Sequence, residues 1–189
     1  MLKIGLVVAS SGGPERMPAL FEKGFSEDAV WMILQRHADA KSLESLAEAL
    51  AEITGRRVRV AAESQVLHGG DILVLLGDRS YGFSENRLNV QDKMGELHLD
   101  GLLLALCDAK AALACVWMTG PGLEGQGLTG LNALAKCGAK IYGVKNLNEP
   151  AGAAVKRLAE GDLPCEALDL GGALARVQFG RKGVDSRSN

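Results

Sequence analysis

Residues 3–14 read KIGLVVASSGGP, and this stretch decides which fold the rest of the sequence is expected to build. Lys3–Val8 is an apolar run without polar alternation, which is typical of a strand buried on both faces of a parallel sheet. The run breaks at Ser10 into serines and glycines, and Pro14 then suits the first turn of a helix. A strand, a short glycine-rich loop and a helix in that order begin a βαβ unit.

The remaining sequence continues this alternation of strands and helices. Apolar runs predict further strands at Val30–Gln35, Arg57–Val60, Ile72–Leu76, Leu113–Met118 and Lys140–Val144. Helical spacing of apolar residues predicts helices at Pro14–Lys23, Ser42–Thr54, Leu99–Ala111, Gly125–Lys136 and Pro150–Glu160, with one more near Leu170–Val177. We therefore expect a Rossmann-like α/β fold, with a doubly wound, mostly parallel sheet that carries helices on both faces.

The stretch from Glu63 to Met94 departs from this alternation, because glycines divide it into short extended runs. It predicts a small antiparallel hairpin excursion from the main sheet. A length of 189 residues fits one domain with its own core. We expect that domain to span residues 1–179 and to be followed by a flexible polar tail at residues 180–189.

Charge and hydropathy exclude several classes of function. The 21 basic and 23 acidic residues are interspersed and leave a net charge of −2, so no phosphate-tracking surface for nucleic acid is expected. No run approaches the roughly 20 apolar residues of a membrane-spanning helix, and the first residues lack the features of a secretory signal. We expect a soluble, cytoplasmic protein without membrane insertion.

The cysteines lie in apolar or small-residue contexts and show no C-x-x-C spacing; they are Cys107, Cys115, Cys137 and Cys165. Free cysteine packs as a small hydrophobic residue, so this pattern predicts buried, unpaired thiols. It predicts neither a zinc site nor a disulfide framework.

Ser10 stands where the first strand gives way to the glycine loop, at the edge where open parallel sheets bind ligands. The residue types allow three roles for this loop. Ser10 caps the following helix, or the loop holds a phosphate or other anion, or the Ser10 hydroxyl is a nucleophile beside free backbone N–H groups. The loop matches neither G-x-S-x-G nor G-x-x-x-x-G-K-[ST], the motifs of two common families.

Two further loops at the same expected edge carry ionisable side chains. His37 follows the second strand, and an imidazole there suits a general base if the first two strands are neighbours. Glu124 lies in TGPGLEG, residues 119–125, where a carboxylate would orient the histidine. Each also has a plainer interpretation, His37 as an exposed loop residue and Glu124 as an acid favoured by the dipole of the following helix. Their joint placement on strand-to-helix loops favours catalysis.

Several stretches resemble the motifs of one known family. Residues 7–14, VVASSGGP, are similar to G-A-S-T-G-G, and residues 33–37, ILQRH, are similar to V-Q-H. Residues 118–125, MTGPGLEG, resemble L-T-G-M-G-x-D-G. Shorter similarities lie in between, at residues 45–50, 58–63 and 75–79. Together they resemble the catalytic domain of the chemotaxis protein-glutamate methylesterases (CheB-type), in order from about Lys3 to Arg157.

This resemblance implies a serine hydrolase with a catalytic triad. It assigns the nucleophile to Ser10, the general base to His37 and the orienting carboxylate to Glu124, which replaces the family's aspartate. It implies neither a cofactor nor a metal. The backbone N–H groups that would support the oxyanion fall at Ser11, Gly12 and Gly122.

The resemblance also implies the substrate and the partners. The reaction is hydrolysis of methyl esters on glutamyl residues of chemoreceptor-like membrane proteins, together with deamidation of glutamine at the same sites. The main partner is therefore the cytoplasmic part of a methylated receptor. No receiver domain precedes the catalytic motifs, so control by phosphorylation is expected to be absent or to come from a separate regulatory protein.

Departures from the family motifs keep a second function open. Pro121 replaces the methionine of T-G-M-G and lacks an N–H group that would serve as an oxyanion donor. Ser80 replaces the histidine of P-G-D-[RK]-H. Together with Glu124 in place of the aspartate, they motivate the alternative of a CheB-like binding module, which keeps the fold and docks a receptor or signalling partner without catalysis. A third interpretation is a flavodoxin-like binder of nucleotide or phosphate at Ser10–Gly13.

Overall fold

The computed structural model describes residues 1–9, 13–35, 38–92, 99–118, 127–145, 165–170 and 174–181, with the backbone alone at residues 13, 14 and 145. The strands are β1 (Leu2–Ala9), β2 (Ala29–Gln35), β3 (Val58–Ala61), β4 (Gln65–Val66), β5 (Ile72–Leu75), β6 (Arg79–Ser84), β7 (Arg87–Asp92), β8 (Ala111–Trp117), β9 (Lys140–Lys145) and β10 (Cys165–Asp169). The helices are α1 (Gly13–Phe21), α2 (Ala40–Thr54), α3 (Leu99–Asp108) and α4 (Leu128–Lys136), with a 3-10 turn, η1, at Leu174–Arg176.

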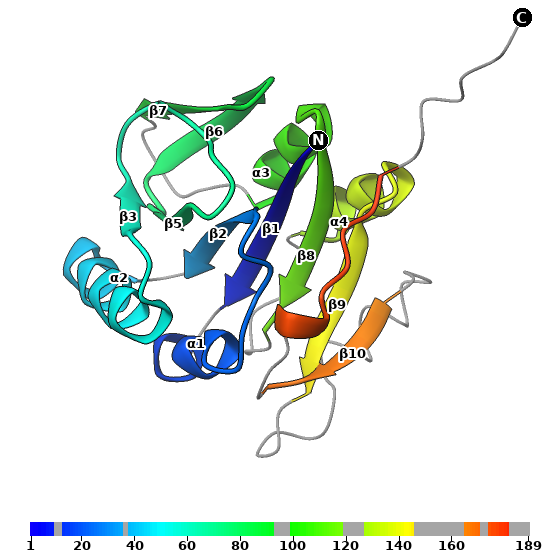
Figure 1. Ribbon diagram of the computed structural model, residues 1–189. Helices are drawn as coiled ribbons and strands as arrows, with labels where there is room; N and C mark the ends of the chain where they lie inside the picture. The colour runs from blue at the N-terminus through cyan, green and yellow to red at the C-terminus, as the bar shows by residue number, and fades with distance from the viewer. Residues whose placement is uncertain are drawn as a thin grey trace, which may run out of the picture.

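A seven-stranded sheet forms the centre of the molecule, in the order β10-β9-β8-β1-β2-β5-β3 (Figure 1). Every neighbouring pair in this order is parallel. The six strands predicted from apolar runs are confirmed to within two residues at each end. The expected mostly parallel sheet is therefore present.

Strand β10 was missed by the sequence prediction, which expected only a helix in that part of the chain. Its side chains are mostly exposed, and Leu168 is the buried one. A strand at the end of a sheet, with one neighbour and one buried side chain, does not need the apolar run that marks the central strands. The helix expected near Leu170–Val177 is also wrong in the described part of that range, where η1 forms a single turn.

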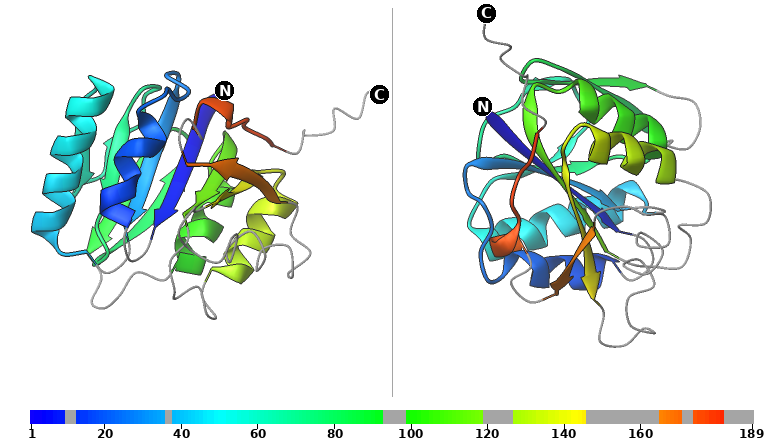
Figure 2. Two further views of the ribbon diagram at one scale, coloured as in Figure 1. Left: turned by 90° about the horizontal axis from the view of Figure 1, so that it is seen from below. Right: turned by 90° about the vertical axis from the view of Figure 1, so that its right-hand side faces the viewer.

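Helices cover both faces of the sheet, as expected for a doubly wound fold (Figure 2). On one face α1 and α2 contribute buried side chains such as Met17, Leu20 and Leu50. On the other face α3 and α4 contribute Leu103 and Leu134. The sheet is therefore buried on both sides, which explains why its central strands are continuously apolar.

The clearest predicted helix, α2, ends where its sequence signals place it. Asp39 is its N-cap and accepts a hydrogen bond from the Ser42 backbone N–H at 2.7 Å. Gly55 ends it in the left-handed conformation, at φ 62°. Leu43, Leu46 and Leu50 are buried against the sheet.

Two predicted helix boundaries need correction, and one helix lies outside the described residues. The helix expected to reach Ala111 ends at Asp108, because Ala111 already begins β8. The helix expected from Gly125 begins at Leu128, after Gly127 at φ 96°, a conformation that a right-handed helix excludes. The helix expected at Pro150–Glu160 is not among the described residues.

A second, antiparallel sheet confirms the predicted hairpin excursion. Its strand order is β4-β7-β6, and β6 and β7 are joined by a tight turn. Phe83 and Leu88 of this sheet are buried in the same core as α3. The excursion therefore covers part of the sheet face that carries α3.

Tyr81 attaches this small sheet to the end of β5. Its hydroxyl accepts a hydrogen bond from the Leu76 backbone N–H at 2.6 Å and lies 3.1 Å from the Leu76 carbonyl oxygen. The side chain is buried, and burial raises the pKa of the phenol to about 12. Tyr81 thus satisfies backbone groups that follow a central strand.

Replacing Tyr81 with phenylalanine is expected to lower the free energy of unfolding by about 1–3 kcal/mol, because the Leu76 N–H loses its buried acceptor. Urea denaturation at pH 7 measures this difference. The folded pKa lies above the ordinary value of about 10, so this tyrosine's contribution is complete below pH 10 and is lost as the pH rises towards 12. The difference in free energy of unfolding between wild type and variant should therefore become smaller from pH 10 to pH 12. A difference that stays constant over this range would contradict the role assigned to the Tyr81 hydroxyl.

Gly5 in β1 lies directly against the indole of Trp31 in β2. The two residues are register partners, and a Cβ at Gly5 would stand 2.4 Å from Trp31 Cζ3. Trp31 is fully buried, and its Nε1–H donates a hydrogen bond to the Ser26 carbonyl oxygen at 3.1 Å. The absence of a side chain at residue 5 is therefore a condition for this core packing.

The amino edge of the sheet holds both ends of the described chain. Leu2, at the start of β1, pairs with Ala111 of β8. Gly180, where the predicted tail begins, pairs with Leu113 of β8 through hydrogen bonds of 2.8 and 3.1 Å. No helix among the described residues is long and apolar enough to cross a membrane.

Candidate active site

Three neighbouring strands end at the same edge of the sheet, and each leads into one of the predicted site loops. β1 lies between β8 and β2, and the arrowheads of the three strands point to one edge (Figure 1). Ala9, the last residue of β1, is the register partner of Gln35, the last residue of β2. Val8 is in turn the partner of Trp117, the last residue of β8. The condition that the first two strands are neighbours is thus confirmed.

The ends of these strands are fixed by burial and by hydrogen bonds. Ala9 is fully buried, and Gln35 and Met118 are 4% and 5% exposed. The Met118 backbone N–H donates a hydrogen bond to the Val8 carbonyl oxygen at 2.8 Å, which extends the pairing of β1 and β8 by one residue. The segments that follow therefore begin from closely spaced, well-packed positions.

The predicted site residues themselves lie outside the described residues: Ser10, Ser11, Gly12, His37, Gly122 and Glu124. The structure describes the residues on either side of them. Ser10 follows Ala9 directly, His37 comes two residues after Gln35, and Glu124 lies between Met118 and Gly127. The assignment of catalytic roles therefore stays a prediction.

Gly127 closes the segment that contains Glu124, and sequence reasoning did not single it out. It has φ 96°, and a Cβ on it would lie 3.0 Å from Trp117 Cη2 and 2.9 Å from Leu99 Cδ2. Trp117 is the last residue of β8, so Gly127 lies against the side chain that ends this strand. The positive φ and the close contact together require glycine at this position.

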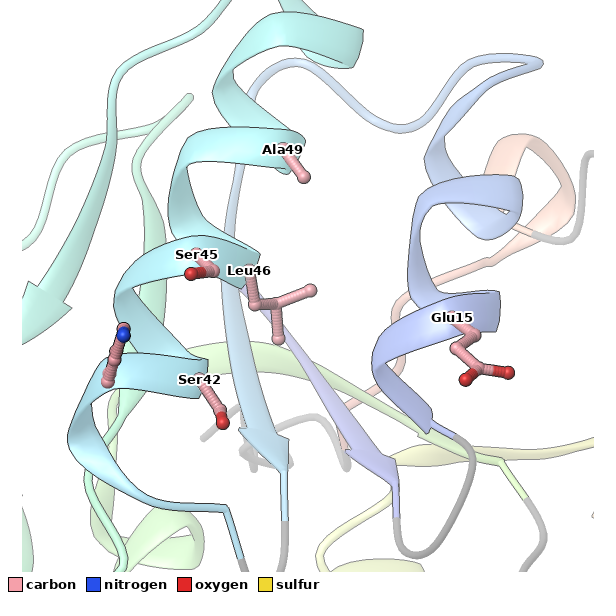
Figure 3. Close-up of a pocket in the computed structure, with 6 residues that line it drawn as sticks. Glu15, Ser42, Ser45, Leu46 and Ala49 are labelled. Atoms are coloured by element: carbon pink, nitrogen blue, oxygen red, sulfur yellow. The ribbon is translucent and has the colours of Figure 1, made fainter.

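A groove between α1 and α2 opens beside the same edge (Figure 3). It has a volume of about 420 Å³, and Leu46, which is 4% exposed, forms its apolar part. Glu15 of α1 lies across it from Ser42 and Ser45 of α2. Sequence reasoning missed this groove, because its two walls come from helices that are separated along the chain by a whole strand.

The groove has polar walls at the end nearest the carboxyl ends of β1 and β2 (Figure 3). Lys41 also lines it, so it carries one acidic and one basic side chain. Asp39 lies just before this end of α2, and hydrogen bonds from the backbone and side chain of Ser42 lower the pKa of its carboxyl. In the described part of the chain, no group of three or more histidine, cysteine or acidic residues could hold a metal ion.

Comparisons with known proteins give a family match and a structural match. A family model described as CheB methylesterase matches residues 5–158, a range that contains all three predicted site loops. The structure is similar to the crystal structure of the Thermotoga maritima CheB methylesterase catalytic domain, with a TM-score of 0.76. That similarity covers 93% of this chain and 97% of the other at 17% sequence identity, and therefore shows the shared fold. No curated protein matches the sequence.

Proposed function

This chain belongs to the CheB methylesterase family, and from that membership we propose that it is a serine hydrolase that removes methyl esters from glutamyl residues of chemoreceptor-like proteins. The observation that carries the proposal is the meeting of β8, β1 and β2 at one edge. The loops after these strands contain a hydroxyl, an imidazole and a carboxylate. Those three groups are the components of a hydrolytic triad.

The proposed roles follow the chemistry of each side chain. The Ser10 hydroxyl attacks the ester carbonyl carbon, and His37 accepts its proton. Glu124 holds the imidazole in the required tautomer and stabilises the imidazolium that forms. The pairing of Ala9 with Gln35 supports these roles, because Ser10 is bonded to the first of these residues and His37 follows the second by two positions.

The remaining steps need no further reagent than water. Backbone N–H groups near Ser11, Gly12 and Gly122 stabilise the oxyanion of the tetrahedral intermediate. His37 returns the proton to the departing methanol, which leaves a glutamyl ester on Ser10. Water, deprotonated by His37, then hydrolyses this acyl-enzyme and regenerates Ser10. A glutamine side chain would follow the same route, with ammonia in place of methanol.

The partner proposed for this site is the methylated cytoplasmic part of a receptor, which places the reaction in the cytoplasm. The groove between α1 and α2 supports a polypeptide substrate, because it lies beside the carboxyl ends of β1 and β2 (Figure 3). Its walls carry an acidic, a basic and two hydroxyl side chains. A receptor segment on either side of the ester could lie there. Any control by phosphorylation is assigned to a separate regulatory protein.

A fluorophosphonate probe tests the nucleophile without knowledge of the receptor. Such probes form a covalent bond with an activated serine, so wild type is expected to take up one probe per chain, on Ser10. Ser10→Ala should take up none. Ser11→Ala is the matched control, since it changes the neighbouring hydroxyl, and it should still be labelled. Intact mass spectrometry gives the stoichiometry, and peptide mapping gives the modified residue.

The second candidate function is a CheB-like binding module without catalysis. Pro121 favours it, since proline has no backbone N–H to offer an oxyanion. A folded wild-type chain that takes up no probe would contradict the hydrolase proposal and support this second function.

A further inference from the structure

Helices α3 and α4 lie side by side in near backbone contact (Figures 1 and 2). Gly130 allows this approach, because a Cβ there would lie 2.5 Å from Leu103 Cβ and 3.1 Å from Asp100 Cα. The Gly130 backbone N–H also donates a hydrogen bond to Asp100 Oδ1 at 2.6 Å. These contacts fix how the two helices are aligned at their first turns.

This alignment places Cys107 and Cys137 at the same level, at the carboxyl ends of α3 and α4. α3 leads into β8 and α4 into β9 after short turns, and these strands are parallel, so the helices run in the same direction. Cys107 lies two helical turns beyond Asp100, and Cys137 lies two turns beyond Gly130 (100 to 107 and 130 to 137). Each cysteine is therefore on nearly the same side of its helix as the residue that makes the interhelical contact.

The two thiols interact and are accessible. Burial raises the pKa of the Cys107 thiol to about 12, and a hydrogen bond with the Cys137 thiol adds to that rise. Both residues are only partly buried, so the prediction of buried thiols is wrong for this pair, and small reagents can reach them. The Cys107 thiol also donates a hydrogen bond to the Leu103 carbonyl oxygen at 3.7 Å. The pairing with Cys137 rests on the close contact and common alignment of the two helices.

The other two cysteines do not offer an equivalent pair. Cys115 of β8 and Cys165 of β10 are both register partners of Ile141 in β9. A whole strand therefore separates them, at about 10 Å, whereas a disulfide requires Cα atoms within about 7 Å. Cys115 is also fully buried.

We propose that Cys107 and Cys137 are a modification site that forms a reversible disulfide in response to peroxides. The site lies outside the proposed catalytic machinery. Its existence does not depend on hydrolase activity, so either proposal can fail while the other stands.

The reaction with hydrogen peroxide balances in two steps. One thiolate attacks an oxygen of the peroxide, the O–O bond breaks, and a sulfenic acid and hydroxide form. The second thiol attacks the sulfenic sulfur, the S–S bond forms, and water leaves. Overall, two thiols are oxidised to one disulfide and one peroxide is reduced to two waters. Because the thiolate is the reactive form, the raised pKa makes the Cys107 thiol a slow nucleophile at neutral pH.

Peptide mapping of the oxidised full chain tests the proposal. The reduced protein is treated with hydrogen peroxide, its free thiols are alkylated, and it is digested without reductant. We expect one linked pair of peptides containing Cys107 and Cys137, two hydrogens lighter than the reduced peptides and released by dithiothreitol. Cys107→Ser and Cys137→Ser should each abolish the link, and Cys165→Ser should keep it. The disulfide closes the part of the chain between Cys107 and Cys137 into a loop, which should raise Tm by roughly 5–10 °C.

Phenylarsine oxide gives a second measurement, because its arsenic binds two adjacent thiols with loss of water. Wild type and Cys165→Ser should bind one arsenic per chain, and Cys107→Ser should bind none. Arsenic bound to this pair without formation of the disulfide would show adjacent thiols but overturn the redox proposal. The redox proposal would also be overturned if peptide mapping after oxidation found both Cys107 and Cys137 alkylated, or found either of them linked to another cysteine.

Discussion

Replacing Ser10 with alanine is expected to end methanol release from methylated glutamyl residues while the chain stays folded. As nucleophile, this hydroxyl forms the acyl-enzyme, and triad members in serine hydrolases act as a unit. Removing one of them lowers kcat by roughly 10⁴–10⁶-fold. Turnover of a methylated receptor fragment measures the loss, and thermal unfolding confirms that the variant is folded.

The same variant separates the roles that the sequence left open for this loop. If Ser10 only caps α1, the substitution should cost about 1 kcal/mol of stability and leave turnover unchanged. If the loop binds an anion, phosphate or nucleotide should protect wild type against unfolding more than the variant. Ser11→Ala should stay within about tenfold of wild type in kcat. Unchanged turnover in Ser10→Ala would eliminate the proposed mechanism.

Gly5→Ala is expected to destabilise the protein by about 3 kcal/mol or more, because the new methyl group would overlap the indole of Trp31. The ring has no free space to move into. It is fully buried, and it packs edge-on against Phe21 and Phe179, with ring centroids 6.1 and 5.8 Å away. Urea denaturation should show an earlier midpoint, or no folded baseline at all.

Two variants make this expectation specific. Gly77→Ala is the matched control, because a Cβ there meets nothing within 4 Å, and its stability should lie within about 1 kcal/mol of wild type. Combining Gly5→Ala with Trp31→Leu should cost less than the sum of the single changes, since the smaller side chain makes room for the methyl group. Additive losses would show that overlap with Trp31 is not the cause.

The central fold could be predicted from the sequence because parallel strands buried on both faces leave a clear apolar signal. Lys3–Val8 and the strand expected at Val30–Gln35 are such runs, and both lie within the observed β1 and β2. Helix α2 was equally clear, since its apolar spacing ends at Gly55. β10 carried no such signal, because an edge strand with a single buried residue leaves most of its side chains to water.

The candidate site could be predicted only in part. The sequence placed Ser10, His37 and Glu124 after strands, but strand order is a property of the whole sheet. β8 lies beside β1 in the sheet. The two strands are nevertheless far apart along the chain, because the antiparallel excursion and α3 come between them in the sequence. The groove between α1 and α2 also depends on the arrangement of whole elements, because its walls come from two separate helices.

The pairing of Leu2 with Ala111, and of Gly180 with Leu113, places the start of β1 and residue 180 around the same stretch of β8. That stretch belongs to the edge opposite the one where β1, β2 and β8 end. A solid support or an affinity handle coupled through Met1 would therefore hold the molecule by its far side. Immobilised in this way, the protein would still leave the edge where β1, β2 and β8 end open to large molecules in solution.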